Sequence, residues 1–445
     1  MAHWLCSARL APLAFSLGLA ANSLSASPTF ASPTIPEATA AARVDQRQQQ
    51  VRQVRPESYD VARYPIANWD HWRNMLWVTA LVEPRETYVT EAVARLISMQ
   101  HSDLSSSEKR TLDMAMTIAN QLYLSDSAFY ASLRPPLEQT LAQSSDSYWV
   151  GIALSTLTQV GSTAEQRITW RNQVIQRFPN WQNDVYLYST LRDVGAIDQP
   201  TELPPLRDLL QWSIAPNEPQ LYVFCRPDRG VLCQTVLKDA NGEFVRQEGT
   251  LWSIPLVLRS LHNLPWIFTR GQSPQGIYRI EGTVPQPDTE YFRPFGLFSL
   301  VNLYIPFESG VQAFVPGRAS QLTSLPSYQS LLPPSWRNYF PIQQTYWAGK
   351  AGRSEFRIHG TGESPGLFTS NSRYTQTAGW NPSIGCLSAL ELYDENGQLQ
   401  QADMPKILEA LTAASRAELT GYLIVVDVPG DDTPVSLAEI ESALQ

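Results

Sequence analysis

A histidine and a cysteine stand near the two ends of one polar stretch of the chain, residues 356–387. His359 is the last histidine in the sequence and Cys386 is the last cysteine. The 26 residues between them are rich in Gly, Ser, Thr, Asn and Pro, which predicts a loop and not a helix. A thiol, an imidazole and a glycine that frees nearby backbone N–H groups are the parts of a cysteine acyl-transfer site.

The chemistry of such a site requires Cys386 as a thiolate. A free thiol has a pKa near about 8.5, so it is mostly protonated at pH 7, and a neighbouring imidazole can lower that pKa. We therefore expect His359 to accept the thiol proton and later to give one to a leaving amine. The alternative is a buried Cys386 and a His359 at a strand end that do not contact each other.

Three short motifs, taken together, resemble those of the YkuD-type L,D-transpeptidases, which are cysteine enzymes of bacterial cell-wall synthesis. They are Ser-Pro-Gln-Gly-Ile-Tyr-Arg-Ile (273–280), Ile-His-Gly-Thr (358–361) and Ser-x-Gly-Cys-Leu (383–387). The resemblance covers about residues 220–428. It implies a mixed β-sandwich for this part of the chain.

The resemblance also implies roles for residues around the nucleophile. The backbone carbonyl of Gly360 would orient the imidazole, and the N–H groups of Gly385 and Cys386 would stabilise the oxyanion, each donor contributing roughly 2.7–4 kcal/mol. Ser388 stands where the family usually has Arg or Asn. The residues expected to contact substrate are Ser383, Ser388 and Arg357, with Arg353 and Arg373 as alternatives to Arg357.

The implied reaction is acyl transfer on peptidoglycan peptide stems. Cys386 would attack the amide before the terminal D-Ala of a tetrapeptide stem, release D-Ala and form a thioester. An amine of another stem, such as that of diaminopimelate, would then take the acyl group and form a cross-link. With water as acceptor the protein would be an L,D-carboxypeptidase. A third possibility is a catalytically inactive cell-envelope scaffold that binds wall material through its helical half.

A competing nucleophile motif, G-x-S-x-G, occurs at residues 362–366. Two facts oppose it. The residue after the serine should donate its N–H to the oxyanion, and Pro365 has none. The histidine of such a site should follow the serine in the chain, and no histidine follows His359.

Composition sets the class of protein. The chain has 445 residues, of which 43% are hydrophobic and 17% charged, so we expect two or three folded domains. A formal net charge of -9 argues against a nucleic-acid binder, which normally has a basic face. No zinc-protease, P-loop or dinucleotide motif is present, and His71 and His101 have no ligand partners at metal spacing, so neither a metal nor an organic cofactor is expected.

The N-terminus predicts export. Arg9 precedes an apolar run, residues 10–24, and small residues follow, so residues 1–26 are interpreted as a signal peptide of a periplasmic or cell-envelope protein. No later run is long enough to span a membrane. Three cysteines then remain. Cys225 and Cys233 flank a predicted turn between two strands and are expected to form a disulfide, which leaves Cys386 as a free thiol.

The residue pattern changes along the chain and predicts an α+β protein with an N-terminal helical domain. Residues 27–56 are interpreted as a linker, and residues 57–200 have the periodicity of about six helices. The sequence from 220 to 428 has short β-branched and aromatic runs, and residues 284–350 within it are expected to be an insertion that either covers the substrate or packs on the sandwich. Residues 429–445 are interpreted as a C-terminal tail. The oligomeric state is left open.

Overall fold

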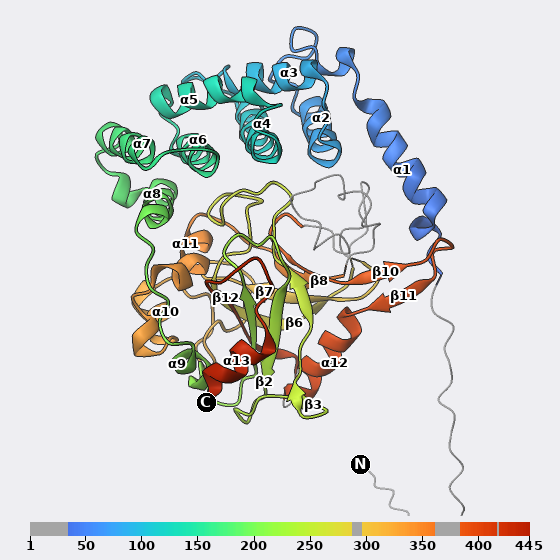
Figure 1. Cartoon of the computed structure of the whole chain (residues 1–445), viewed down its shortest axis with the longest axis vertical. Helices are drawn as coiled ribbons and strands as arrows, with labels where there is room; N and C mark the ends of the chain where they lie inside the picture. Colours follow the sequence, from blue (N-terminus) through green and yellow to red (C-terminus); the bar gives the residue numbers. More distant parts are fainter. Residues whose placement is uncertain (1–33, 287–295, 361–382, 416–417) are drawn as a thin grey trace, which may run out of the picture.

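A computed structural model describes residues 34–286, 296–360, 383–415 and 418–445. They form an arch of helices above a closed β-barrel (Figure 1), which confirms the α+β class. The predicted signal peptide, residues 1–26, lies outside the described residues. No helix in the described ranges is long and apolar enough to cross a bilayer.

The helical arch follows from amphipathic sequences with good N-caps. Seven helices, not about six, fall within residues 57–200. A capping box of Ser105 and Glu108 begins α4, and one of Thr163 and Gln166 begins α7. The helices of the arch are α1 (Ala40–Gln53), α2 (Trp69–Val82), α3 (Thr87–Ile97), α4 (Ser106–Ser125), α5 (Arg134–Gln143), α6 (Ser147–Gln159), α7 (Ala164–Arg177) and α8 (Val185–Asp198).

The interpretation of residues 27–56 as a linker was wrong for the part that the structure describes. Thr39 caps α1 by accepting a hydrogen bond from Ala42 N–H, and the Arg47 guanidinium donates to the carbonyl of Leu81 at 2.8 Å. The start of α1 is also held by the barrel domain, because Ala40 N–H donates to the carbonyl of Glu395. These contacts compensate for a helix that is polar nearly all round.

The β-rich half is a closed barrel, so the expected mixed sandwich was wrong as a description of the sheet. The strand order around the barrel is β1-β12-β6-β7-β8-β9-β5-β2. It closes because the short β5 pairs with both β2 and β9. The barrel strands are β1 (Gln220–Cys225), β2 (Cys233–Lys238), β5 (Pro255–Val257), β6 (Gly276–Val284), β7 (Leu300–Tyr304), β8 (Phe356–His359), β9 (Leu387–Ala389) and β12 (Thr420–Asp427).

Both faces of the central strands are covered. On β1, Leu221 and Val223 belong to the core that the barrel shares with the arch, whereas Tyr222 and Phe224 belong to a second core on the other face. This explains why β1 is an unbroken apolar run instead of an alternating one. Two small hairpins and three helices complete the domain: β3 (Arg246–Gln247) with β4 (Thr250–Leu251), β10 (Glu391–Tyr393) with β11 (Leu399–Ala402), α9 (Leu206–Gln211), α12 (Met404–Ala414) and α13 (Leu437–Leu444).

Residues 284–350 are not an insertion into the barrel. Strand β7 lies in this segment and pairs with β6 and β8, so the barrel cannot close without it. The segment also forms α10 (Leu325–Ser330) and α11 (Gln344–Lys350). Tyr328 and Trp336 are fully buried in the second core, so the described part of the segment packs on the barrel. Its many prolines and aromatics had suggested a separate unit because they interrupt strand periodicity.

The C-terminal residues are likewise not a tail. Helix α13 begins with a capping box of Ser436 and Glu439, buries Ile440, and packs beside α9. Arg226, which is buried, forms a 3.0 Å ion pair with Glu439. An amphipathic eight-residue helix is short enough to be mistaken for a polar tail in the sequence.

In addition to the contacts of α1, the arch meets the barrel domain at residues 258–273, here called the docking loop. Asn120 Nδ2 on α4 donates to the carbonyl of His262 at 2.7 Å, and Gln121 Oε1 is 2.7 Å from His262 Nδ1. Phe268 packs so closely against α6 that a Cβ at Gly151 would lie 2.9 Å from its ring. The docking loop is therefore fixed by the helical domain on one side and, as shown below, holds the candidate nucleophile on the other.

Candidate active site

The two predicted catalytic residues lie on the neighbouring strands β8 and β9 or directly beside them. They pair in parallel, with Ile358 opposite Leu387 and His359 opposite Ser388. His359 is the last residue of β8 and Cys386 immediately precedes β9, so the nucleophile lies beside the strand that carries the histidine. The Cys386 thiol lies against the β8 backbone, 3.7 Å from the carbonyl oxygen of Glu355.

The alternation of side chains on β8 explains how apolar and polar residues share this short strand. Phe356 and Ile358 point into the barrel core, together with Leu387 and Ala389 of β9. Arg357 and His359 therefore lie on the opposite face. The apolar residues fix the register, and a shift by one residue would turn the histidine into the core.

The tautomer of His359 is set by its neighbour. His359 Nδ1 lies 2.7 Å from the carbonyl oxygen of Gly360, so Nδ1 carries the proton and donates it to that carbonyl, as expected from the resemblance. The basic lone pair is then on Nε2. The imidazole is buried, with a relative exposure of 1%.

Ser383 shapes the turn before the nucleophile. Its hydroxyl donates to the carbonyl of Cys386 at 2.6 Å and accepts from the N–H of Gly385 at 3.1 Å. Ser383 therefore holds the turn, and its predicted contact with substrate stays a prediction. The Gly385 N–H, predicted as an oxyanion donor, is already engaged, which leaves the Cys386 N–H as the remaining one of the two predicted donors.

Gly385 is required by both conformation and space. Its φ is +133°, a backbone angle that L side chains rarely adopt. A Cβ there would overlap the Arg353 guanidinium and lie 3.1 Å from the carbonyl oxygen of Gly271. The glycine of the Ser-x-Gly-Cys motif is thus explained by the fold itself.

The upstream motif reaches the same turn. Ser273 Oγ donates to the carbonyl of Gly385 at 2.8 Å, and the N–H of Leu261 donates to the carbonyl of Ser383 at 2.7 Å. Ser260 forms an isolated parallel bridge with Ser383. The docking loop therefore holds the Cys386 turn at both of its ends, and the three motifs found in the sequence meet in space.

The arginines predicted to bind a substrate carboxylate lie in different environments. Arg353 is buried, and its guanidinium donates to the carbonyls of Gly271, Gln272 and Trp266. It holds the docking loop, so it is not available to bind a substrate carboxylate. Arg357 is only partly buried and donates to its neighbour Phe356 O at 2.6 Å, so of the two it is the one that substrate can reach. Arg373 lies outside the described residues, as does the G-x-S-x-G motif at 362–366.

The protonation state of Cys386 differs from the thiolate that the sequence led us to expect. Burial raises the pKa of the Cys386 thiol to about 11, although the Arg357 N–H and the charges of Arg357 and Arg353 favour the thiolate. Burial lowers the pKa of His359 to about 4, against the raising effect of its bond to Gly360. At neutral pH both groups are therefore uncharged. The prediction of a lowered Cys386 pKa was wrong for this state, because desolvation outweighs the favourable contacts.

Two further groups lie near the histidine: Glu391, which gave no signal in the sequence, and Ser388, which was predicted to contact substrate. The buried Glu391 carboxylate accepts from the N–H of Leu297 at 2.9 Å and lies against Gly360, where a Cβ would collide with it. It supports the backbone that follows His359, and burial raises its pKa. Ser388, paired with His359, is fully buried, and its hydroxyl has no hydrogen-bond partner among the residues that the structure describes.

The predicted disulfide is present between Cys225 and Cys233, and Cys386 is a free thiol of intermediate exposure. No cluster of three His, Cys, Asp or Glu residues that could hold a metal occurs in the described ranges. Comparisons with protein-family models, curated proteins and solved structures gave no match.

Proposed function

We propose that this chain is an exported cysteine acyl transferase of the L,D-transpeptidase type that acts on peptidoglycan peptide stems. The observation that supports it is the convergence of three sequence motifs on one turn: Ser273 holds Gly385, Gly385 precedes Cys386, and Cys386 lies beside the strand that ends in His359. A structural cysteine would need none of these arrangements. The disulfide supports an oxidising location such as the periplasm or cell envelope.

The proposed reaction begins from the neutral pair. As the Cys386 sulfur attacks the carbonyl carbon before the terminal D-Ala, His359 Nε2 takes the thiol proton, and the Gly360 carbonyl holds the resulting imidazolium through Nδ1–H. The Cys386 N–H donates to the oxyanion. Collapse of the tetrahedral intermediate breaks the C–N bond, and the imidazolium protonates the departing D-Ala amine. A thioester remains on Cys386.

The second half of the proposed reaction reverses these steps with a new nucleophile. An amine of another stem attacks the thioester, His359 accepts its proton, and the thiolate leaves and is protonated by the imidazolium. Water in place of the amine gives the carboxypeptidase product. Arg357, partly exposed next to the thiol, is the proposed contact for a stem carboxylate.

The inactive scaffold is retained as the second candidate because of one observation. The raised pKa of Cys386 and the lowered pKa of His359 describe a pair without charge at neutral pH, and such a pair is also what a structural cysteine would have.

Mass spectrometry of reaction products separates the candidates. The purified protein is incubated with a disaccharide-tetrapeptide beside Cys386→Ala and His359→Ala variants, without reductant so that Cys225–Cys233 stays oxidised. The transpeptidase predicts loss of D-Ala and a cross-linked dimer with the wild type only. Trimmed tripeptide without dimer indicates the carboxypeptidase. No D-Ala release, with no thioester adduct on the intact protein, overturns the enzyme and leaves the scaffold.

A further inference from the structure

A cleft lies on the inner side of the helical arch. It is a cleft of about 590 Å³ between the arch and the docking loop. Figure 1 shows the arch standing over this side of the barrel, with α4 and α6 nearest to the loops below. Its walls combine aromatic, cationic and acidic side chains, among them Trp69, Lys109, Arg110, Asp113, Asp146, Tyr148, Tyr186 and Arg270.

The two carboxylates of the cleft share one lysine. Lys109 Nζ lies 2.6 Å from Asp146 and 3.5 Å from Asp113. Asp113 also accepts a 2.6 Å hydrogen bond from the indole N–H of Trp149. Lys109 therefore offsets one of the two negative charges, and with Arg110 and Arg270 the lining of the cleft holds three cationic and two acidic side chains.

The two arginines of the cleft are not neutralised. Neither Arg110 nor Arg270 forms an ion pair with a carboxylate in the described part of the chain. Arg110 is exposed on α4. The pKa of Arg270 is lowered by burial and by the nearby charge of Arg73, so this guanidinium gains from any anion placed beside it. Arg270 also has a positive φ of 64°, which fixes an unusual backbone for a side chain at a cleft wall.

The aromatic side chains form a rigid floor. The Tyr148 ring meets those of Tyr186 and Phe268 edge-on, with centroids 5.0 Å and 5.4 Å apart. Phe268 is anchored against Gly151. Rings held in this way offer flat apolar surface to a ligand at little cost in side-chain entropy.

The cleft is coupled to the Cys386 turn through the docking loop. The carbonyl of Arg270 accepts a hydrogen bond from Ser260 Oγ, and Ser260 bridges to Ser383. Three residues after Arg270, Ser273 holds Gly385. A ligand on Arg270 thus contacts the same loop that positions the nucleophile.

We propose that this cleft binds the carboxylate-bearing peptide of a muropeptide, with Arg110 and Arg270 contacting its carboxylates and Tyr148 and Tyr186 contacting its uncharged parts. This inference rests on the proposed function for the identity of the ligand. It assigns to the helical half the task of holding a substrate molecule beside the catalytic domain.

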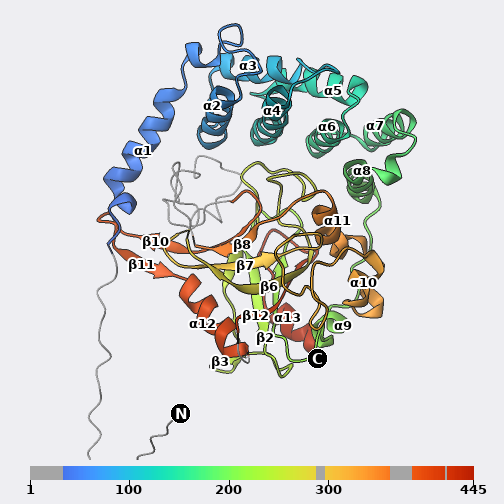
Figure 2. The same ribbon diagram turned by 180° about the vertical axis from the view of Figure 1, so that it is seen from behind.

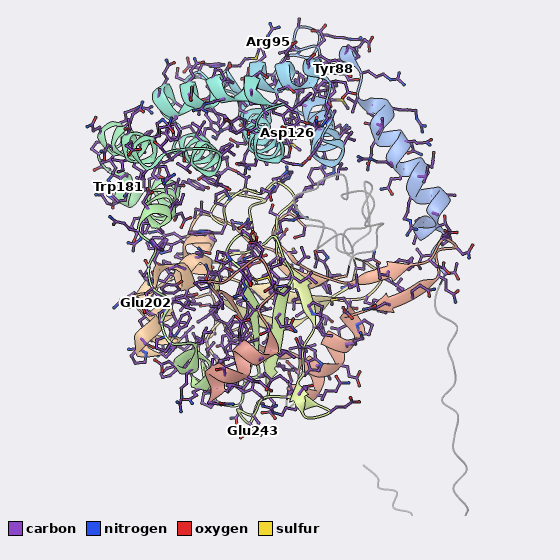
Figure 3. The ribbon with its side chains drawn as sticks, in the orientation of Figure 1. Tyr88, Arg95, Asp126, Trp181, Glu202 and Glu243 are labelled. Atoms are coloured by element: carbon purple, nitrogen blue, oxygen red, sulfur yellow. A yellow bond between two sulfur atoms is a disulfide. The ribbon has the colours of Figure 1, made fainter. Side chains whose placement is uncertain are left out.

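Calorimetric titration tests it without turnover. Disaccharide-tetrapeptide is titrated into Cys386→Ala protein and into the same protein with Arg270→Gln or Arg110→Gln. Each change is expected to raise the Kd at least fivefold. The matched control is Arg95→Gln, an exposed arginine that Figure 3 labels on the outer side of the arch, and it is expected to leave the Kd unchanged. Arg110 lies on a helix surface, so its variant folds even if Arg270→Gln does not.

A second ligand tests whether the arginines bind the carboxylates of the muropeptide. The same muropeptide with its carboxylates amidated is expected to bind the Cys386→Ala protein weakly, and Arg270→Gln is expected to weaken it no further. Binding unchanged by both arginine variants, or reduced equally by Arg95→Gln, overturns the inference. Absence of any muropeptide binding also overturns it.

The two proposals can fail separately. If the arginine variants weaken binding but the wild type forms no product, the cleft stands and the enzyme does not. If the wild type forms product with a KM that Arg270→Gln and Arg110→Gln leave unchanged, the enzyme stands and the cleft does not.

Discussion

Ser273 and Gly385, 112 residues apart in the chain, are joined by a 2.8 Å hydrogen bond from the serine hydroxyl to the glycine carbonyl. Both residues are buried. The bond ties the docking loop to the residue that precedes the nucleophile. Four predictions follow from this arrangement and from the groups around it.

Removal of the Ser273 hydroxyl should loosen the Cys386 turn. Ser273→Ala leaves a buried carbonyl without its donor, a loss of about 1–3 kcal/mol. We expect kcat/KM for D-Ala release to fall roughly 10-fold or more, whereas Ser273→Thr, which keeps a hydroxyl, should retain most of the activity. Ser330→Ala, an exposed serine of α10, is the control. Equal activity of Ser273→Ala and wild type would show that the bond does not position the nucleophile.

A side chain at Gly385 should be strongly destabilising. Gly385→Ala combines a φ of +133° with overlap against Arg353, so the free energy of unfolding is expected to fall by about 2–4 kcal/mol. Gly249→Ala is the matched control, because Gly249 has a φ of +86° but open space around its Cα. Its cost should be only about 1–2 kcal/mol. Chemical denaturation of the two variants measures both values, and equal losses would contradict the role of Arg353.

Alkylation of Cys386 should depend steeply on pH. A thiol with a pKa of about 11 is protonated at neutral pH, and its thiolate fraction rises about tenfold per pH unit below that value. The iodoacetamide rate should therefore climb from pH 7 to 10 without a plateau. Because His359, with a pKa of about 4, is uncharged in this range, His359→Ala should change the alkylation profile little while abolishing turnover. A plateau with an apparent pKa below 8 would contradict this resting state.

His262 should make stability pH-dependent. Burial lowers its pKa from 6.5 to about 3, so as the pH falls below 6.5 the unfolded chain takes up a proton before the folded one. The contribution of the neutral imidazole is complete above pH 6.5 and is lost towards pH 3, by up to about 1.4 kcal/mol per pH unit.

The difference in unfolding free energy between wild type and His262→Gln should therefore shrink between pH 6.5 and 4. Carboxyls with raised pKa, such as Asp427, affect both proteins alike and cancel in the difference. His101→Gln, at an exposed histidine, supplies the baseline. Parallel stability curves for wild type and His262→Gln would show that this histidine does not limit acid stability.

The parts of the site that the sequence predicted were those encoded in short contiguous motifs. The order of His359 and Cys386, the Gly360 carbonyl and the Ser-Pro-Gln-Gly segment all depend on local residue types. The positive φ of Gly385 likewise agrees with the residue type, since glycine adopts such an angle most easily. The capping box that begins α4 is a local signal of the same kind, encoded within a few residues.

The features that the sequence did not predict depend on contacts between residues far apart in the chain. Closure of the barrel requires the three-residue strand β5 to pair with β9. Three residues are too few to form a pattern that predicts this pairing. Helix α1 looked like a linker because its stabilising contacts come from Leu81 and Glu395. The raised pKa of Cys386 is a property of burial, and Glu391 reaches Gly360 only because of the fold.

The helical arch is fastened to the barrel at both of its ends. At one end, Ile35 and Ala40 donate to the carbonyls of Gly397 and Glu395 in the turn between β10 and β11. At the other end, α8 contacts α11, and the docking loop meets α4 and α6 between them (Figure 2). Because the arch is attached to the barrel at both ends, it cannot rotate about a single hinge. Any separation of the two domains must break the contacts at both ends, so we expect the arch and the barrel to move as one body.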